Sequence, residues 1–350
     1  MKSKLILLLL PLAICLSGSC KKSASGSTPV LPPADTSSPR QSFFAKGADI
    51  SWLTQMESAG YAFYDSTGTK KDCLQLLQSL GFNSIRLRAW VNPADGWCNT
   101  TDLLTKALRA KALGMRIMID FHYSDRWADP GHQFKPQAWS ALTGDSLSAA
   151  IYQYTYRVMD SLKSAGILPD WVQVGNETND GMLWEDGRAS THMAAFAALV
   201  QAGYRAVKAV SDSSRVIVHI SNGYDNTLFR WIFDGLRAAG AHWDIIGMSL
   251  YPSTGGWSGV DASCLANMLD MVSRYSTPVM ICEVGMDVTQ PDITRSFLED
   301  ILKKTRSVPG ENGLGVFYWE PESYNNWQGY TLGAFDNNGR PTSALNAFRP

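Results

Sequence analysis

The feature that most constrains the fold is an alternation of short apolar runs with longer amphipathic segments, which continues from near residue 45 to the C-terminus. The apolar runs are rich in β-branched residues, as buried strands are, whereas the segments between them carry apolar residues at the helical spacings of three and four. The eight candidate strands are residues 45–51, 83–90, 114–123, 171–177, 215–221, 244–251, 278–284 and 315–321. The clearest candidate helices are residues 73–82, 103–114 and 192–210.

Strands that alternate with helices in this way predict a parallel sheet, because a parallel connection needs a crossover. Eight such units over roughly 300 residues fit a closed barrel better than an open sheet. We therefore predict an α/β fold, a single (β/α)8 TIM barrel formed by residues 43–350, and find no pattern that indicates a second domain. In this architecture the active site lies at the C-terminal ends of the strands.

Each candidate strand is apolar until its end, where polar or aromatic residues follow. One polar strand end means little, but several at one face of a barrel are hard to explain by packing alone. In strand order these residues are Asp49; Arg86 and Arg88; Asp120 and His122; Asn176 and Glu177; His219 and Asn222; Tyr251; Glu283; and Trp319 with Glu320.

Glu177 and Glu283 end the fourth and seventh strands, which face each other across the mouth of such a barrel. Two carboxyl groups roughly 5 to 5.5 Å apart carry out retaining glycoside hydrolysis, one as general acid and one as nucleophile. We expect burial and the nearby carboxylate to raise the pKa of Glu177, and the neighbouring Arg88 to keep Glu283 ionised.

Other strand-end residues have structural interpretations. We assign Arg86 and Asp120, which lie deeper along their strands, to a buried polar network, and His219 to a hydrogen-bonded position in the core. Glu320 is a rival carboxylate, but strand alternation places it on the side opposite Trp319.

The same alternation bears on Asn176 and Glu177, which are adjacent in the sequence. Both side chains can reach one site only if the strand has already bent before them.

Several motifs together resemble the endo-β-1,4-galactanases of glycoside hydrolase family 53, within the large clan of (β/α)8 retaining glycosidases. They are KGADISWL, FYDSTG, RLRAWVNP, DFHYSDRWADPGHQFKPQAW, VQVGNE, HISNGYD, a YP pair after the sixth strand and GVFYWEP, in the order of that family. The resemblance spans residues 46 to about 335, and the long fourth motif is far more specific than VGNE alone.

The resemblance implies that Glu177 is the acid/base and Glu283 the nucleophile, acting on β-1,4-galactan without a cofactor. It implies that Asn176 hydrogen-bonds the sugar 2-hydroxyl. Residues implied to support the nucleophile are Arg88, His122 and Tyr251. Residues implied to line the glycan cleft are Asp49, Asp125, Trp127 and Trp319.

Tryptophans in loops that follow strand ends can stack on the faces of sugar rings. Those in such positions are Trp90, Trp127, Trp257 and Trp327, whereas Trp139, Trp171 and Trp231 occur in contexts typical of packing.

The net charge and the residue types of the loops limit which ligands the protein can bind. The 31 Lys and Arg residues balance 32 Asp and Glu residues, which leaves no basic footprint for nucleic acid. The short connection CEVGMDVTQPDIT lacks the acidic, Asn-rich and His-containing insertion with which bacterial relatives bind calcium, so we do not favour a structural calcium ion and expect no metal site. A monomer is the default expectation.

The N-terminus, MKSKLILLLLPLAICLSGSC, has two lysines before an apolar run that is too short to span a membrane and that closes on small residues. It resembles a bacterial lipoprotein signal covering residues 1–20, with Cys20 as the lipidated residue. Residues 21–42 are rich in Ser and Pro and are interpreted as a flexible tether. We expect an exported protein, anchored to the outer membrane at the cell surface or facing the periplasm, or else secreted.

The catalytic domain keeps Cys73, Cys98, Cys264 and Cys282. Export permits disulfides, but four cysteines allow three pairings and their spacing selects none.

Two alternatives to a galactanase remain at this stage. One is a retaining glycanase of the same clan that acts on mannan, xylan or β-glucan, since the fold and the catalytic pair do not choose the sugar. The other is a glycan-binding surface lipoprotein that has lost turnover.

Overall fold

The computed structural model describes residues 44–350, and the predicted signal, tether and Cys20 lie outside them. Eight parallel strands close into a barrel, with each strand paired to its neighbours in chain order and the last paired to the first. The strands are β1 (Ala45–Asp49), β4 (Ser84–Ala89), β5 (Arg116–Phe121), β6 (Trp171–Val174), β7 (Arg215–Ile220), β8 (Ile245–Leu250), β9 (Val279–Val284) and β10 (Gly313–Trp319). All eight predicted strands are confirmed, and so is the (β/α)8 barrel.

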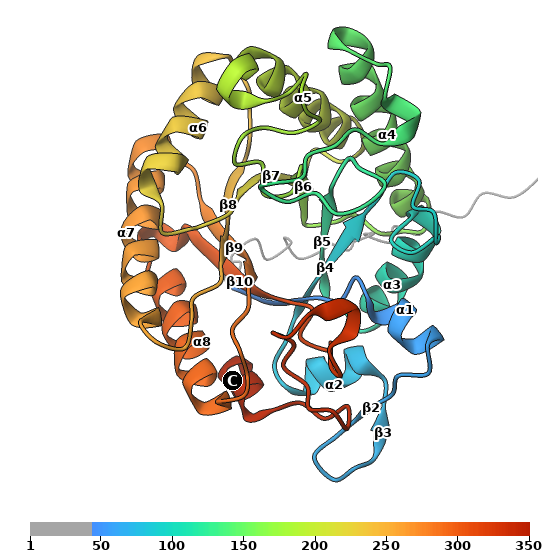
Figure 1. Ribbon diagram of the computed structural model, residues 1–350, viewed down its shortest axis with the longest axis vertical. Helices are drawn as coiled ribbons and strands as arrows, with labels where there is room; N and C mark the ends of the chain where they lie inside the picture. The colour runs from blue at the N-terminus through green and yellow to red at the C-terminus, as the bar shows by residue number, and fades with distance from the viewer. Residues whose placement is uncertain (1–43) are drawn as a thin grey trace, which may run out of the picture. The chain divides into compact units, whose positions relative to one another are not determined.

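Helices between the strands form a ring outside the barrel (Figure 1). They are α2 (Cys73–Ser79), α3 (Thr100–Ala112), α4 (Gly144–Ser164), α5 (Ala189–Val210), α6 (Asn226–Ala238), α7 (Trp257–Tyr275) and α8 (Pro291–Arg306), with the shorter α1 (Leu53–Ser58) after β1. The 3-10 segments are η1 (Gln137–Trp139), η2 (Pro309–Glu311), η3 (Trp327–Gly329) and the longer η4 (Ser343–Phe348). Side-chain caps start several helices: Asp72, Asn99 and Asp225 each accept a hydrogen bond from a backbone N–H of the first turn.

A small antiparallel hairpin, β2 (Phe63–Tyr64) and β3 (Lys70–Lys71), precedes α2. The periodicity did not predict it, because two-residue strands are too short to show alternation. Asp65 holds its turn by accepting hydrogen bonds from the N–H groups of Thr67 and Thr69.

The barrel interior below the mouth is filled by apolar side chains from the first and middle residues of the strands. They are Ala45, Met118, Trp171, Ile217, Ile245, Met280, Cys282 and Phe317. Gly47 is required here, because a Cβ at its position would lie 2.0 Å from the ring of Phe317. The larger apolar layer lies between the barrel and its helices.

Cys73, Cys98, Cys264 and Cys282 are all buried free thiols, so none of the three possible disulfide pairings is formed. Within residues 44–350 no helix combines the length and apolarity needed to cross a membrane. The same residues contain no group of three or more His, Cys, Asp or Glu side chains arranged to hold a metal ion.

Candidate active site

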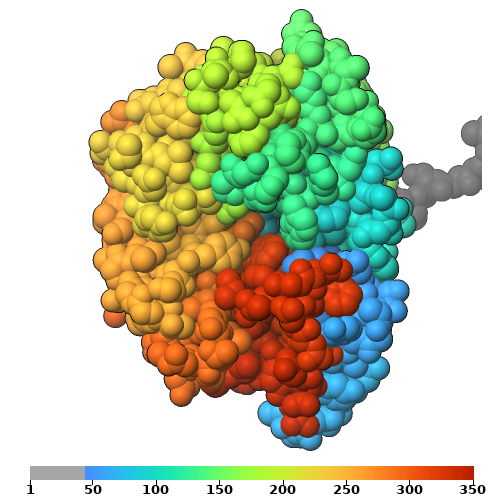
Figure 2. All heavy atoms as spheres, in the orientation of Figure 1, coloured from blue at the N-terminus to red at the C-terminus, as the bar shows by residue number. Residues whose placement is uncertain are grey.

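A pocket of about 340 Å³ opens at the C-terminal ends of the strands, above the apolar filling of the barrel. It is lined by His122, Trp127, Ala128, Asp129, Asn176, Glu177, Tyr251, Glu283, Trp319 and Tyr330. In Figure 2 the segments that follow β5 (green) and β10 (red) meet over the centre of the molecule, with a hollow between them. The two glutamates predicted as a pair therefore share one cavity, as the strand ends indicated.

The chain bends before Asn176 and Glu177, which brings both side chains into this pocket. Strand β6 ends at Val174, Gly175 has a φ of 88° and Glu177 a φ of 44°. Such a φ is unfavourable for a residue with a side chain and persists only where the surroundings enforce it. Gln133 holds the bend by donating to the carbonyl oxygen of Asn176 at 2.8 Å. The strand alternation that would separate the two side chains has thus ended before they occur.

Glu283, near the end of β9, is bound through both carboxyl oxygens. Its Oε1 forms an ion pair with Nη2 of Arg86 at 2.7 Å, and its Oε2 accepts a hydrogen bond from the Tyr251 hydroxyl at 2.8 Å. Both partners stabilise the carboxylate form and fix its orientation, which is what a nucleophile needs.

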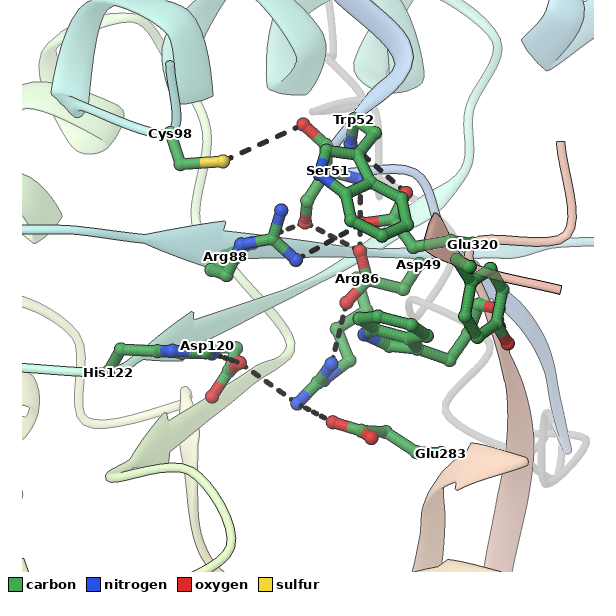
Figure 3. A network of polar contacts seen from close by, with 12 residues as sticks. Asp49, Ser51, Trp52, Arg86, Arg88, Cys98, Asp120, His122, Glu283 and Glu320 are labelled. Carbon is green, nitrogen blue, oxygen red and sulfur yellow. Dashed lines mark hydrogen bonds and ion pairs between the residues drawn. The ribbon is translucent and has the colours of Figure 1, made fainter. Parts of the chain in front are cut away.

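Arg86 lies at the centre of a buried ionic network beneath the pocket (Figure 3). Its guanidinium contacts Asp49 at 2.6 Å and Asp120 at 2.9 Å as well as Glu283. It also donates to Oε1 of Gln173 and to Oδ1 of Asn176. A buried cation with three carboxylate partners is retained only with such complete pairing.

This network corrects two expectations. Arg88 was expected to hold Glu283 ionised, but Arg86 makes that ion pair and Arg88 instead pairs with Glu320 at 3.1 Å. The two arginines are two residues apart on β4 and therefore lie on the same side of the strand. Neighbouring strands of a closed barrel are offset along its axis, and this offset brings Arg86, and not Arg88, next to Glu283. Asp49 was expected to line the cleft, but it is fully buried and binds Arg86 and Ser51.

The surroundings give the two glutamates different protonation. Burial raises the pKa of Glu177 to about 8, and the charge of Glu283 adds to this effect. Burial also raises the pKa of Glu283, to about 7, against the opposing effects of Arg86 and the Tyr251 hydroxyl. Glu283 therefore ionises first, and between about pH 7 and about pH 8 Glu283 is mainly a carboxylate while Glu177 mainly keeps its proton. This is the division of roles expected of a nucleophile and a general acid.

His122 is held as a neutral imidazole. Its Nδ1 accepts a hydrogen bond from the backbone N–H of Ala128 at 3.0 Å, which leaves the proton on Nε2 for Asp120 at 2.9 Å. Burial lowers the pKa of His122 despite the nearby carboxylate. His122 lines the pocket, but the hydrogen-bond and ion-pair partners of the Glu283 carboxyl group are Tyr251 and Arg86.

Trp127 and Trp319 line the pocket beside the two tyrosines, and their ring centroids are 5.7 Å apart. The adjacent Glu320 is not part of the pocket lining: its side chain is fully buried and accepts a hydrogen bond from the backbone N–H of Trp52 at 3.0 Å. Strand β10 ends at Trp319 and Glu320 has a φ of 46°, so the turn after the strand, and not strand alternation, places the Glu320 side chain in the buried structure. Asp125, in contrast, lies outside the lining and accepts from the backbone N–H groups of Asn92 and Gln137, so it ties two mouth loops together.

Several residues of the site were not found from the sequence. Ser249 lies close enough to Glu177 to lower its pKa, and its Oγ is 2.7 Å from Nε2 of His219; Tyr330 reaches the pocket from a loop after β10. A serine inside an apolar strand and a tyrosine in an irregular loop carry no periodic signal, so only a family pattern could have found them. His219 is fully buried and hydrogen-bonded, in agreement with its interpretation as a core histidine.

A second groove of about 600 Å³ adjoins the pocket and shares Tyr330 with it. Its other polar and aromatic lining comes from the loops after β9 and β10 and includes Asp287, Thr289, Tyr324 and Asn326.

Comparison with known proteins agrees with this geometry. The family model described as Glycosyl hydrolase family 53 matches residues 45–348. A Niallia circulans protein, described only as uncharacterized and encoded in the bgaB 5′ region, is 36% identical over 89% of this chain and 94% of its own. The arabinogalactan endo-β-1,4-galactanase of Thermothelomyces thermophilus is 32% identical over 87% of this chain and 98% of its own.

The fold comparison gives the same result. A solved fungal β-1,4-galactanase superimposes with a TM-score of 0.80 at 30% sequence identity, covering 86% of this chain and 98% of its own. With the matched residues spanning the whole barrel and two glutamates in one mouth pocket, the chain belongs to glycosyl hydrolase family 53.

Proposed function

We propose that the protein is an endo-β-1,4-galactanase that hydrolyses the galactan side chains of pectin with retention at the anomeric carbon. The observation that carries the proposal is the unequal pair of carboxyl groups in one pocket: Glu283 is bound by Arg86 and Tyr251, while Glu177 is half-buried and has the higher pKa. The galactanase relatives support the choice of sugar.

In the first step, the carboxylate of Glu283 attacks the anomeric carbon as the glycosidic C–O bond breaks and Glu177 gives its proton to the leaving oxygen. In the second, Glu177 takes a proton from water, the water oxygen attacks the anomeric carbon and the bond to Glu283 breaks. Arg86 and Tyr251 stabilise the negative charge that returns to the Glu283 carboxylate when its bond to the sugar breaks. No cofactor is needed for either step.

The groove that adjoins the pocket supports a polymeric substrate. Its volume of about 600 Å³ adds to the about 340 Å³ around the catalytic pair, and its hydroxyl, amide and carboxylate groups suit sugar hydroxyls. The axial 4-hydroxyl of galactose leaves one face of the sugar more apolar, which suits the rings of Trp127 and Trp319.

The test is product release from linear β-1,4-galactan by the wild-type protein and its Glu283→Gln variant, with mannan, xylan and β-glucan in parallel. We expect short β-1,4-galacto-oligosaccharides, with the β-anomer formed first by NMR, from the wild type alone. The exposed helix variant Glu299→Gln is the control and should behave as wild type. Cleavage of another polymer only would contradict the substrate; binding without any cleavage would favour a glycan-binding lipoprotein.

We further propose that the protein is exported and anchored through a lipid on Cys20, and that it acts as a monomer. Support comes from the apolar N-terminal run that ends at this cysteine. Labelling of cells with a radioactive fatty acid should mark the wild type and not Cys20→Ser. Scattering of the purified protein should give the mass of one chain.

A further inference from the structure

Arg88 is a fully buried cation with little of the pairing that such a group normally has. Its single ion pair joins Nη1 to Glu320 at 3.1 Å (Figure 3). Among residues 44–350, its Nε and Nη2 atoms have no hydrogen-bond partner by distance and angle, and the buried Cys98 thiol is the other polar group beside the guanidinium. Leaving buried donors unpaired costs free energy, so the arrangement needs a compensating interaction or a role.

Three tryptophans surround this guanidinium. Its Cζ lies 4.1 Å from the ring centroid of Trp127, 5.0 Å from that of Trp90 and 5.7 Å from that of Trp52. These distances are in the range of cation–π contacts, which are stronger where water is excluded. The ring faces thus replace the missing hydrogen-bond acceptors.

Trp127 differs from the other two rings because it reaches the active-site pocket. Trp90 and Trp52 are buried, whereas Trp127 is 36% exposed and lines the cavity with both catalytic glutamates. Trp127 meets Trp52, Trp90 and Trp319 in T-shaped contacts, with ring centroids 5.3–5.7 Å apart. Arg88 covers one ring face, so the exposed part of the ring is available to a sugar.

Glu320 fixes the guanidinium in this position. One carboxyl oxygen binds Arg88 and the other accepts from the backbone N–H of Trp52, and the carboxyl group is fully buried. Arg88 also donates its backbone N–H to the Ser51 hydroxyl at 2.8 Å. The side chain that touches Trp127 is therefore anchored at both ends, by strand β4 and by the residue that follows β10.

We propose that Arg88 is a positioning residue for substrate specificity: its guanidinium, locked by Glu320, sets the plane of Trp127 as a stacking platform for the apolar face of a β-linked galactose unit. The role is indirect, since Arg88 lies behind the ring and has no exposed surface. The inference rests on the proposed galactan substrate and adds the device that orients its binding wall.

The test is a double-mutant cycle with Arg88→Met, Trp127→Ala and the combination of both, with KM and kcat measured on galactan. We expect Arg88→Met to raise KM about fivefold with kcat within about twofold, as expected for the loss of roughly 1 kcal/mol of binding. In the Trp127→Ala background the same substitution should change KM by less than about twofold, since the platform it orients is absent. Equal effects of Arg88→Met in both backgrounds would overturn the proposal.

Two further variants separate positioning from stability. Arg88→Lys keeps the charge but not the planar group, so it should fold and still raise KM; it also replaces Arg88→Met if that variant does not fold. Arg116→Met is the matched control, because Arg116 stacks on Trp171 at 3.9 Å at the start of β5, away from the mouth. It should lower the melting temperature without changing KM.

Near-ultraviolet circular dichroism gives a readout independent of turnover, because the signal of coupled tryptophans depends on their relative orientation. Arg88→Lys should change this spectrum, and the change should be absent in the Trp127→Ala background. An unchanged spectrum and unchanged KM in Arg88→Lys would refute the role. Turnover of galactan by the wild type tests the function separately, and the cycle is run on whichever polymer the wild type cleaves.

Discussion

The hydroxyl of Tyr251 donates to Oε2 of Glu283 at 2.8 Å, on the carboxyl oxygen that Arg86 does not bind. Removing this donor with Tyr251→Phe destabilises the carboxylate form and therefore raises the pKa of Glu283. We expect the acidic limb of the kcat/KM profile to move to higher pH, and activity at neutral pH to fall about 10- to 100-fold, the usual value of a hydrogen bond to a charged group. A profile that keeps its acidic limb would show that Tyr251 does not act on Glu283.

The two carboxyl groups predict a narrow bell-shaped pH profile. Glu283 must be ionised, so activity falls as the pH drops through about 7, and Glu177 must be protonated, so activity falls as the pH rises through about 8. For Glu177→Gln we expect low residual activity on an aryl galactoside with a good leaving group, with the alkaline limb absent. Persistence of that limb would assign it to another group.

The raised pKa of Glu177 should also make the free energy of unfolding depend on pH. Its pKa in the folded protein is raised above that of the unfolded chain, so its contribution is fully present below about 4.5 and is lost as the pH rises through about 8. Glu177→Gln removes the ionisation. In urea unfolding we expect this variant to be more stable than wild type at pH 9 and to lose that advantage at low pH.

Removing Arg86 should unfold the mouth of the barrel as well as abolish catalysis. Arg86→Met leaves Asp49, Asp120 and Glu283 buried without their shared cation. Breaking a buried ion pair typically costs about 3–5 kcal/mol, and we expect a loss of at least this size in urea unfolding together with loss of galactan hydrolysis. Near-normal stability would show that the carboxyl groups simply take up protons.

Gly175 should be needed for the active site rather than for the fold alone. At its φ of 88° a Cβ would lie 2.6 Å from Cγ2 of Thr178, so Gly175→Ala displaces the turn that carries Asn176 and Glu177. We expect a large loss of kcat. Gly240→Ala is the matched control, with a φ of 79° and open space around the added Cβ; it should cost about 1 kcal/mol of stability and no activity.

The strands, and the meeting of Glu177 and Glu283 in one pocket, could be predicted because each depends on a local pattern. β-Branched runs give the strands, and Glu177 and Glu283 mark where two of them reach the mouth. The sequence could not show that Arg86, and not Arg88, pairs with Glu283, because two arginines on the same side of one strand have the same chemistry. Which of them meets Glu283 depends on the stagger between strands, a property of the closed barrel.

The turn at Gly175 shows a different limit. The glycine is visible in the sequence, but its φ and the resulting end of β6 at Val174 arise from contacts with Gln133 and the loop after β5. Asp49 was misplaced for a similar reason. A polar residue at a strand end faces solvent or the buried network according to the height of the surrounding strands.

The Phe317 ring that fills the space left by Gly47 closes the barrel below the catalytic glutamates. A sugar chain therefore has no route down the barrel axis and must enter and leave on one side of the molecule. Because the barrel is closed below the pocket, a long chain cannot pass through it, and the length of the products cannot be set by the depth of a tunnel. The position of cleavage then depends on how many sugar units bind to the loops on each side of the pocket.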